Sequence, residues 1–265
     1  MWVIGGLDND QNRKNDVWYS TDGATWEEAT NDAEFIAREG HSSVVFNNKI
    51  WIIGGFNSSL VATNDIWFSE DGITWQQAVS NAPFGFKAYH SSVVFDNKIW
   101  VIGGLDSENS FAETNDVWFS SDGITWSEAT DTALFEERGF HSSFVYNNKI
   151  WITSGFTNSG ITNDVWSSDD GVSWEEVTDT ASFVPRTDHS TLIFDNKIWN
   201  IAGFIGNSTS VKDIWYSDDG INWEEAPLAP FSVRSSHTSL VYNNKVWILG
   251  GFANGEALSD VWTFD

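Results

Sequence analysis

A cationic residue and a histidine recur at a fixed spacing in five places, in the pattern Phe-x-x-Arg/Lys-x-x-His. The five sets are Phe35, Arg38 and His41; Phe84, Lys87 and His90; Phe135, Arg138 and His141; Phe183, Arg186 and His189; and Phe231, Arg234 and His237. They hold five of only 13 Lys and Arg residues, in a chain whose formal net charge is −25. Gathered on one surface, these cations would create a local positive field that binds anionic groups. The alternative is that each cation bonds nearby backbone and fixes its loop.

The residues just before each histidine break the pattern and could set the specificity of such a surface. These pairs are Glu39-Gly40, Ala88-Tyr89, Gly139-Phe140, Thr187-Asp188 and Ser235-Ser236. The pairs include acidic, aromatic and polar residues. One residue from each of three pairs, Tyr89, Phe140 and Asp188, joins the cations in the predicted ligand-binding set. That set comprises Arg38, Lys87, Tyr89, Arg138, Phe140, Arg186, Asp188 and Arg234.

The five histidines suggest a metal site, which their spacing does not favour. A tetrahedral zinc ion needs ligands about 2.0–2.1 Å away, whereas histidines that fall one per repeat are expected to lie too far apart. Each is followed by Ser or Thr, which could satisfy it locally. The chain has no cysteine, which rules out disulfides, thiol catalysis and thiolate ligands. We therefore predict structural histidines, no metal and no cofactor.

Charge and hydropathy exclude other classes of partner. With 38 acidic residues against 13 Lys and Arg, a phosphate backbone would be repelled, so nucleic acid is not expected. No apolar run approaches the length of about 18 residues that a membrane helix requires. The N-terminus also lacks the pattern of a signal peptide. The sequence therefore predicts no membrane partner and leaves the cellular location unknown.

These motifs belong to a repeat that organises the whole chain. The segment His90 to Gly104, HSSVVFDNKIWVIGG, returns with small changes at the other four histidines, at intervals of 48 to 51 residues. Each repeat is expected to form four strands, A to D, as in residues 90–95, 98–104, 115–120 and 124–130. An Asp-Asn or Asn-Asn turn joins A to B, and an Asp-Gly hairpin joins C to D. Such sheets must stack on one another, which predicts an all-β propeller.

All 17 tryptophans belong to this repeat. Strand B carries Trp2, Trp51, Trp100, Trp151, Trp199 and Trp247; strand C carries Trp18, Trp67, Trp118, Trp166, Trp215 and Trp262; strand D carries Trp26, Trp75, Trp126, Trp174 and Trp223. Each would bury roughly 150–250 Å². We therefore expect tryptophan to form the core between sheets, with none left over as a sugar-stacking platform.

The double glycine after strand B, together with the tryptophans of strands C and D, closely resembles the kelch repeat. The double glycine occurs at Gly54-Gly55, Gly103-Gly104 and Gly250-Gly251, whereas two repeats keep only the second glycine, in Ser154-Gly155 and Ala202-Gly203. The C–D hairpin also resembles the Asp-box of sialidase-type propellers, which is a structural turn. The resemblance covers the whole chain and implies a kelch-type β-propeller of four-stranded antiparallel blades.

No catalytic residues are predicted. The copper oxidase that bears kelch repeats needs a Tyr–Cys cofactor, and sialidases need a Tyr–Glu pair and three arginines from non-equivalent places. Acid–base catalysis requires two groups in different environments, and this chain is close to symmetric. We predict a non-catalytic scaffold. A carbohydrate-binding or sugar-modifying propeller, sialidase-like or mutarotase-like, is the alternative.

Loop lengths indicate which face of the propeller binds. From the strand-B Trp to the Asp before strand C the spacing varies between 13 and 16 residues, whereas the A–B and C–D connections keep a constant length. Antiparallel order places the B–C and D–A loops on one face, and loops that vary on a rigid scaffold usually carry binding. We predict recognition of a protein or peptide there. The resemblance implies an acidic one, since peptide-binding kelch proteins use arginines at matching places, and a glycan is the alternative.

The repeat does not divide the chain evenly, because there are six B and six C strands but five A and five D strands. We predict one domain, 1–265, with six blades at approximately 1–30, 41–79, 90–130, 141–178, 189–226 and 237–265. An incomplete seam between the terminal blades could recruit a second copy of the chain. Five blades with two surplus strands is the alternative.

Overall fold

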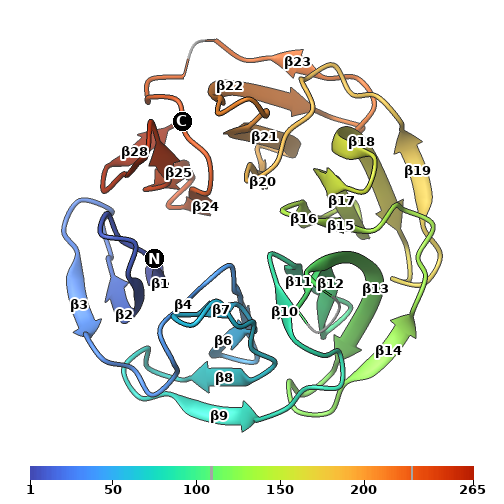
Figure 1. Ribbon diagram of the computed structural model, residues 1–265. Coiled ribbons are helices and arrows are strands. Elements are labelled where there is room, and N and C mark those ends of the chain that lie inside the picture. Colours follow the sequence, from blue (N-terminus) through green and yellow to red (C-terminus); the bar gives the residue numbers. More distant parts are fainter. Residues whose placement is uncertain (108–109, 228) are drawn as a thin grey trace. The chain divides into compact units, whose positions relative to one another are not determined.

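The computed structural model describes residues 1–107, 110–227 and 229–265, which form antiparallel strands joined by turns (Figure 1). The chain divides into two compact units, Met1–Ala133 (unit 1) and Leu134–Asp265 (unit 2). The predicted all-β architecture of antiparallel sheets is confirmed. Among these residues no helix is long and apolar enough to span a membrane.

Unit 1 contains three sheets of the repeat. The first comprises β1 (Trp2–Leu7), β2 (Arg13–Tyr19) and β3 (Glu27–Thr30), joined at one end by β4 (Arg38–Glu39) and β7 (Phe56–Asn57). The second comprises β5 (Ser42–Phe46), β6 (Lys49–Ile53), β8 (Ile66–Ser69) and β9 (Gln76–Val79). The third comprises β10 (Lys87–Ala88), β11 (Ser91–Phe95), β12 (Lys98–Asp106), β13 (Ala112–Ser120) and β14 (Ser127–Thr130).

Unit 2 also contains three sheets of the repeat. The first comprises β15 (Arg138–Gly139), β16 (Ser142–Tyr146), β17 (Lys149–Thr157), β18 (Gly160–Ser168) and β19 (Glu175–Thr178). The second comprises β20 (Ser190–Phe194), β21 (Lys197–Phe204), β22 (Ser210–Ser217) and β23 (Glu224–Glu225). The third comprises β24 (Thr238–Tyr242), β25 (Lys245–Leu249) and β28 (Val261–Phe264), beside the two-stranded ribbon of β26 (Phe252–Ala253) and β27 (Glu256–Ala257).

Four strands, A to D, form in the four repeats that begin at β5, β11, β16 and β20, as predicted. Their registers are set by the turns between them. At the A–B turn, Asp96 and Asn97 have φ of 47° and 53°, the left-handed conformation that a two-residue hairpin requires and that Asp and Asn tolerate best. Short strands such as β10 and β15, which pair the D–A loop with the extended strand B, were not predicted. The six-blade ring and its boundaries stay a prediction.

The C–D hairpin is held by its own side chains. In the hairpin after β13, one carboxylate oxygen of Asp122 accepts the backbone N–H groups of Ile124 and Thr125 at 2.8 and 2.7 Å. Oγ of Ser120 accepts the N–H of Gly123 at 2.8 Å, and Nε1 of Trp126 donates to the Gly123 carbonyl at 3.3 Å. The Ser-x-Asp-Gly-x-x-Trp sequence therefore builds a rigid turn.

Most tryptophans of strands B and D are buried in the core, as predicted, whereas those of strand C are only partly buried. Trp51 and Trp75 in unit 1 and Trp174 in unit 2 are 2 to 3% exposed. Strand-D tryptophans also pack edge-on against the repeated phenylalanine, as in Phe135 and Trp174, whose ring centroids lie 5.0 Å apart. Each repeat thus supplies part of the apolar filling of the interface with the next repeat.

Candidate functional site

Each arginine of the repeated motif is buried and makes two hydrogen bonds to one aspartate. Arg138 donates to both carboxylate oxygens of Asp164, at 2.9 and 2.6 Å, and its side chain is 0% exposed. It also donates to the carbonyl oxygens of Ser154, at 2.8 Å, and Glu136, at 3.1 Å. The other pairs are Arg38 with Asp65, Arg186 with Asp213 and Arg234 with Asp260, and Lys87 bonds Asp116 in the same place. These cations therefore anchor the D–A loop to strand C.

The aspartate partner belongs to the Asp-x-Trp sequence that recurs in strand C. Asp164 accepts a hydrogen bond from Nε1 of Trp166 at 2.7 Å and another from the Thr162 hydroxyl at 2.7 Å. Burial alone would raise the pKa of Asp164, but the hydrogen bonds and charge of Arg138 outweigh it and hold this pKa below its ordinary value. The carboxylate is therefore ionised at neutral pH. Sequence reasoning missed these partners, although their recurrence was visible.

The remaining cations are also engaged. Within the ranges that the structure describes, twelve of the 13 Lys and Arg residues lie within ion-pair distance of a carboxylate, Lys212 being the exception. The exposed positive surface expected from the five motif cations is not formed, because all five are buried. Contact between these five cations and a ligand stays a prediction.

The residues just before the histidines all have left-handed backbone. Tyr89, Phe140 and Asp188 have φ of 52°, 58° and 52°, a conformation that side-chain-bearing residues rarely adopt outside functional or tightly constrained sites. In unit 2 the N–H of Asp188 donates to the carbonyl of Phe140 at 3.1 Å, and that of Ser236 donates to Asp188 at 2.8 Å. In unit 1 the N–H of Tyr89 donates to Gly40 at 2.8 Å. Within each unit, the most irregular residues of neighbouring repeats thus lie next to one another.

Asp188 differs from the other carboxylates of these loops. Its oxygens accept hydrogen bonds from the hydroxyl groups of Thr187 and Ser236, at 3.0 and 3.1 Å. Burial raises the pKa of Asp188 above its ordinary value, and the two hydroxyl groups only partly oppose this. The surroundings of Asp188 therefore disfavour its ionised form.

An aromatic cluster lies among the variable loops of unit 1. It consists of Phe56, Phe86, Tyr89 and Phe111. The ring of Phe56 is buried, and its centroid lies 5.6 Å from those of Tyr89 and Phe111. Phe111 is 47% exposed. The cluster therefore has a buried base, Phe56, and a solvent-exposed side, Phe111. Of these four residues, Tyr89 alone was in the ligand-binding set predicted from the sequence.

Two family models match the chain. The KLHDC2/KLHL20/DRC7 Kelch-repeats domain matches residues 1–203, and the Kelch motif matches residues 234–265. The chain belongs to the kelch-repeat family. Its antiparallel sheets are those of a kelch-type β-propeller. The comparison with curated proteins gave no match. Kelch repeats generally mediate protein–protein interaction and are typically non-enzymatic.

The kelch histidines link neighbouring sheets. Nε2 of His90 lies 2.8 Å from the hydroxyl of Ser42, and Nε2 of His237 lies 2.7 Å from that of Ser190. Burial, followed by the charge of Lys87, lowers the pKa of His90 to about 3; burial and Arg38 lower that of His41 to about 4. These histidines are therefore neutral at physiological pH. No group of three potential metal ligands is found among the described residues.

We expect acid to destabilise the protein through these histidines before its carboxylates titrate. The folded pKa values of His41, His90 and His237, about 4, 3 and 3, lie below the value of about 6.5 for an exposed histidine. The unfolded chain therefore binds more protons below pH ~6.5. The contribution of these histidines to the free energy of unfolding is complete above that pH. It decreases as the pH falls toward their pKa values in the folded protein. The melting temperature should thus decrease from about pH 6.5 downward.

The NMR ring signals of His41, His90 and His237 test the cause directly. In the folded protein they should not shift between about pH 7.5 and 5, whereas in urea they should titrate near the ordinary value of about 6.5. A buried imidazole that titrates near pH 6.5 in the folded protein would contradict this account.

Proposed function

We propose that this kelch domain is a non-catalytic scaffold that binds a protein or peptide through the loop face of unit 1. The loop face is the end of the sheets that carries the B–C and D–A loops. On it, the aromatic cluster of Phe56, Phe86, Tyr89 and Phe111 would receive an apolar side chain of the partner. The general role of kelch repeats in protein–protein interaction supports this assignment.

The exposure of apolar side chains at these loops carries the proposal. Phe111 is 47% exposed, and Leu60 and Val61, on the loop that follows Phe56, are 63% and 48% exposed. Single exposed apolar residues are ordinary, but several on two variable loops that both adjoin Phe56 indicate an interaction surface. Aromatic residues dominate binding energy because they bury a large area at little cost in side-chain entropy.

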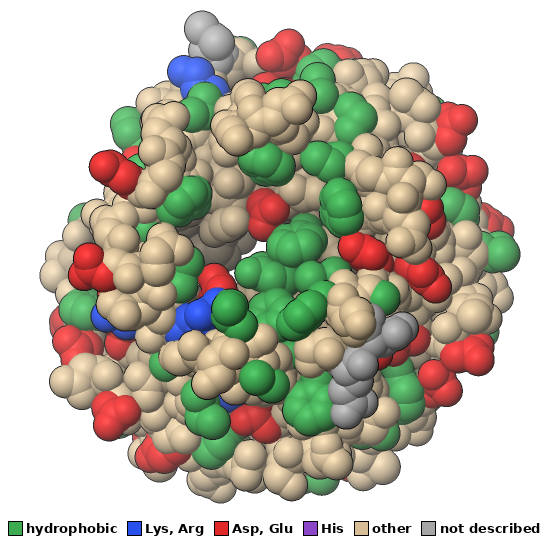
Figure 2. Space-filling model, in the orientation of Figure 1, with side chains coloured by type: hydrophobic (Ala, Val, Ile, Leu, Met, Phe, Trp, Pro, Cys, Tyr) green, Lys and Arg blue, Asp and Glu red, His purple; other side chains and the backbone are tan. Residues whose placement is uncertain are grey.

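The charge of the domain favours a cationic partner over an acidic one. The formal net charge is −25, and twelve of the 13 basic residues in the described ranges already neutralise carboxylates. Figure 2 shows acidic side chains scattered widely over the visible face and cationic side chains in only a few places. A partner that combines an apolar anchor with Lys or Arg fits this surface, because complementary charge speeds association and suppresses wrong partners.

A random peptide library displayed on phage, selected against the purified domain, tests the proposal. We expect enriched peptides to share an aromatic or large aliphatic residue flanked by Lys or Arg. The substitution Phe111→Ser should weaken a selected peptide about tenfold or more, the loss typical of a central aromatic anchor. Affinity should also fall as salt concentration rises.

The matched control is Ile124→Ser. Ile124 is 56% exposed but lies in the C–D hairpin, away from the loop face. Its replacement should leave peptide affinity unchanged. Equal losses from both substitutions, or selection of acidic peptides, would contradict the proposed surface and charge preference. A glycan array on the same protein tests the carbohydrate alternative.

A further inference from the structure

One buried amide group in unit 2 has no hydrogen-bond partner within the protein. Asn200 of β21 is 0% exposed, and neither its side-chain oxygen Oδ1 nor its nitrogen Nδ2 bonds to any residue that the structure describes. An amide group offers two donors and two acceptor positions. Burial without a hydrogen bond is strongly disfavoured, and native proteins nearly always supply one. A ligand that forms hydrogen bonds is therefore expected at Asn200.

Other repeats have an aliphatic residue where Asn200 stands. The equivalent residues, each 0% exposed, are Ile52, Val101, Ile152 and Ile248. In unit 2, Ile248 belongs to one apolar cluster with Ile201 of the preceding sheet. One repeat earlier, the residue in the place of Ile201 is Thr153, which is also 0% exposed. An Asn-on-Thr pair therefore replaces the Ile-on-Ile pair of the next interface.

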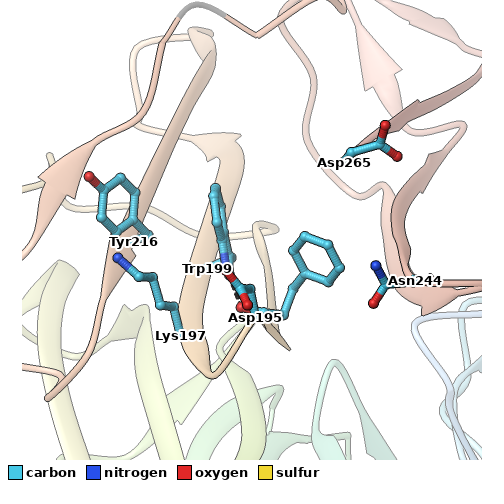
Figure 3. Close-up of a pocket in the computed structure, with 7 residues that line it drawn as sticks. Asp195, Lys197, Trp199, Tyr216, Asn244 and Asp265 are labelled. Atoms are coloured by element: carbon cyan, nitrogen blue, oxygen red, sulfur yellow. Dashed lines mark hydrogen bonds between the residues drawn. The ribbon is translucent and has the colours of Figure 1, made fainter.

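The side chain of Asn200 points toward the preceding sheet. Its neighbour Trp199 borders a cavity, with Asn244, in the turn between β24 and β25, across the open space (Figure 3). Since successive side chains of a strand point to opposite faces, Asn200 lies on the face directed away from this cavity. On that side, Gly220 of the hairpin after β22 lies so close to Trp151 of β17 that an added methyl group would be 2.6 Å from Cζ3 of the indole. Asn200 therefore faces the sheet of β17.

Two threonine hydroxyl groups lie on this side of β21. Thr191 of β20 is directly opposite Asn200 in the register, so the two side chains share one face of the sheet. The hydroxyl of Thr191 lies 3.2 Å from that of Thr153 in β17, which in turn lies 3.0 Å from Nε2 of His189. A hydroxyl group offers one donor and two acceptor positions, which is more than these contacts use. The amide and the two hydroxyl groups therefore form a buried polar group between the sheets.

Water is the ligand whose size and chemistry fit this place. Asn200 and Thr153 are both 0% exposed, which leaves no path for a larger molecule. Threonine lacks the terminal methyl group of isoleucine, and a methyl group is close in size to a water molecule, which occupies about 30 Å³ in the liquid. Internal waters typically make about three hydrogen bonds to buried polar groups. The amide of Asn200 and the hydroxyl groups of Thr153 and Thr191 supply such a set.

We propose that the interface between β17 and β21 in unit 2 binds an ordered internal water molecule through the amide of Asn200 and the hydroxyl of Thr153 or Thr191. The water links the two sheets by hydrogen bonds, where the next interface uses the apolar contact of Ile248 with Ile201. This site is buried, is separate from the loop face of unit 1 and does not depend on the function proposed for that face.

A crystal structure of the unmodified protein at atomic resolution tests the proposal. We expect density for a water molecule within about 3.2 Å of Oδ1 or Nδ2 of Asn200 and of one of the two threonine hydroxyl groups. Crystals of Asn200→Leu, which keeps the branched shape of asparagine but removes both polar atoms, should lack this water. Direct bonds from both polar atoms of Asn200 to protein groups, or no water beside Asn200 in the unmodified protein, would overturn the proposal.

Thermal unfolding in solution supplies an independent test with a matched control. Asn200→Leu removes the amide together with its water and should leave the melting temperature unchanged or raise it, because an apolar contact of the same shape can replace a satisfied polar one. Ile248→Asn places the same amide against the apolar Ile201 and should lower the melting temperature clearly. A large decrease from Asn200→Leu, or no decrease from Ile248→Asn, would contradict a water site specific to Asn200.

Discussion

Replacing Arg138 with alanine should lower the free energy of unfolding by about 3–5 kcal/mol, the cost typical of breaking a buried ion pair from one side. Its side chain is 0% exposed and Asp164 only 13%, so the change leaves a buried carboxylate without its main partner. It also removes the donor to the Ser154 carbonyl. Urea denaturation measures the loss. If Arg138 instead contacted ligand at the surface, its removal would cost little stability.

Two substitutions define the origin of this loss. Lys149→Ala removes a cation whose partner, Asp169, is 71% exposed, so it should change stability by less than about 1 kcal/mol. Arg138→Lys should retain part of the stability lost in the alanine variant, because Lys87 holds Asp116 at 2.7 Å in the equivalent place. Similar losses from Arg138→Ala and Lys149→Ala would refute the assignment of a buried clamp.

The substitution Gly220→Ala should be comparably damaging, although it adds only one methyl group. That group would lie 2.6 Å from the indole of Trp151, and overpacking of this kind costs roughly 1–3 kcal/mol. The φ of Gly220 is 78°, and left-handed backbone adds about 1–2 kcal/mol for a residue with a side chain. Thermal and urea unfolding of the purified variant measure the combined effect.

Gly85→Ala separates the two contributions. Gly85 has a similar φ of 74°, but nothing lies within 4 Å of an added methyl group. Its replacement should therefore cost only the backbone part, about 1–2 kcal/mol. If Gly220→Ala costs no more stability than Gly85→Ala, the close contact between Gly220 and Trp151 is wrong.

The sheets could be predicted from sequence because each of their determinants is local. The A–B turn is specified by Asp96 and Asn97, and the C–D hairpin by Ser120, Asp122 and Gly123, all within a few residues. Tryptophan at a fixed place in three strands then indicated the stacking core. Repetition made each of these signals legible several times over.

The candidate sites depend on contacts that local patterns do not specify. Arg138 meets an aspartate 26 residues away, and only the register of the sheet brings the two together. Phe111 joins Phe56 and Tyr89 from a loop whose length differs among repeats, so its position could not be inferred from the motif. Lys and Arg at a fixed spacing indicated a binding surface, but their pairing with strand C is a property of the folded sheet.

The contact between the hairpin glycine and the tryptophan of the preceding sheet has a consequence for how such chains change in evolution. Within unit 1, Gly72 fits Trp2 and Gly123 fits Trp51; in unit 2, Gly220 fits Trp151. The repeat of β5 to β9 thus presents the indole of Trp51 to one neighbour and Gly72 to the other. Recombination that duplicates or deletes one whole repeat of 48 to 51 residues recreates the same contact at the new junction. The number of repeats can therefore change during evolution. Substitution of the hairpin glycine or of the strand-B tryptophan is disfavoured, because it would disrupt the contact.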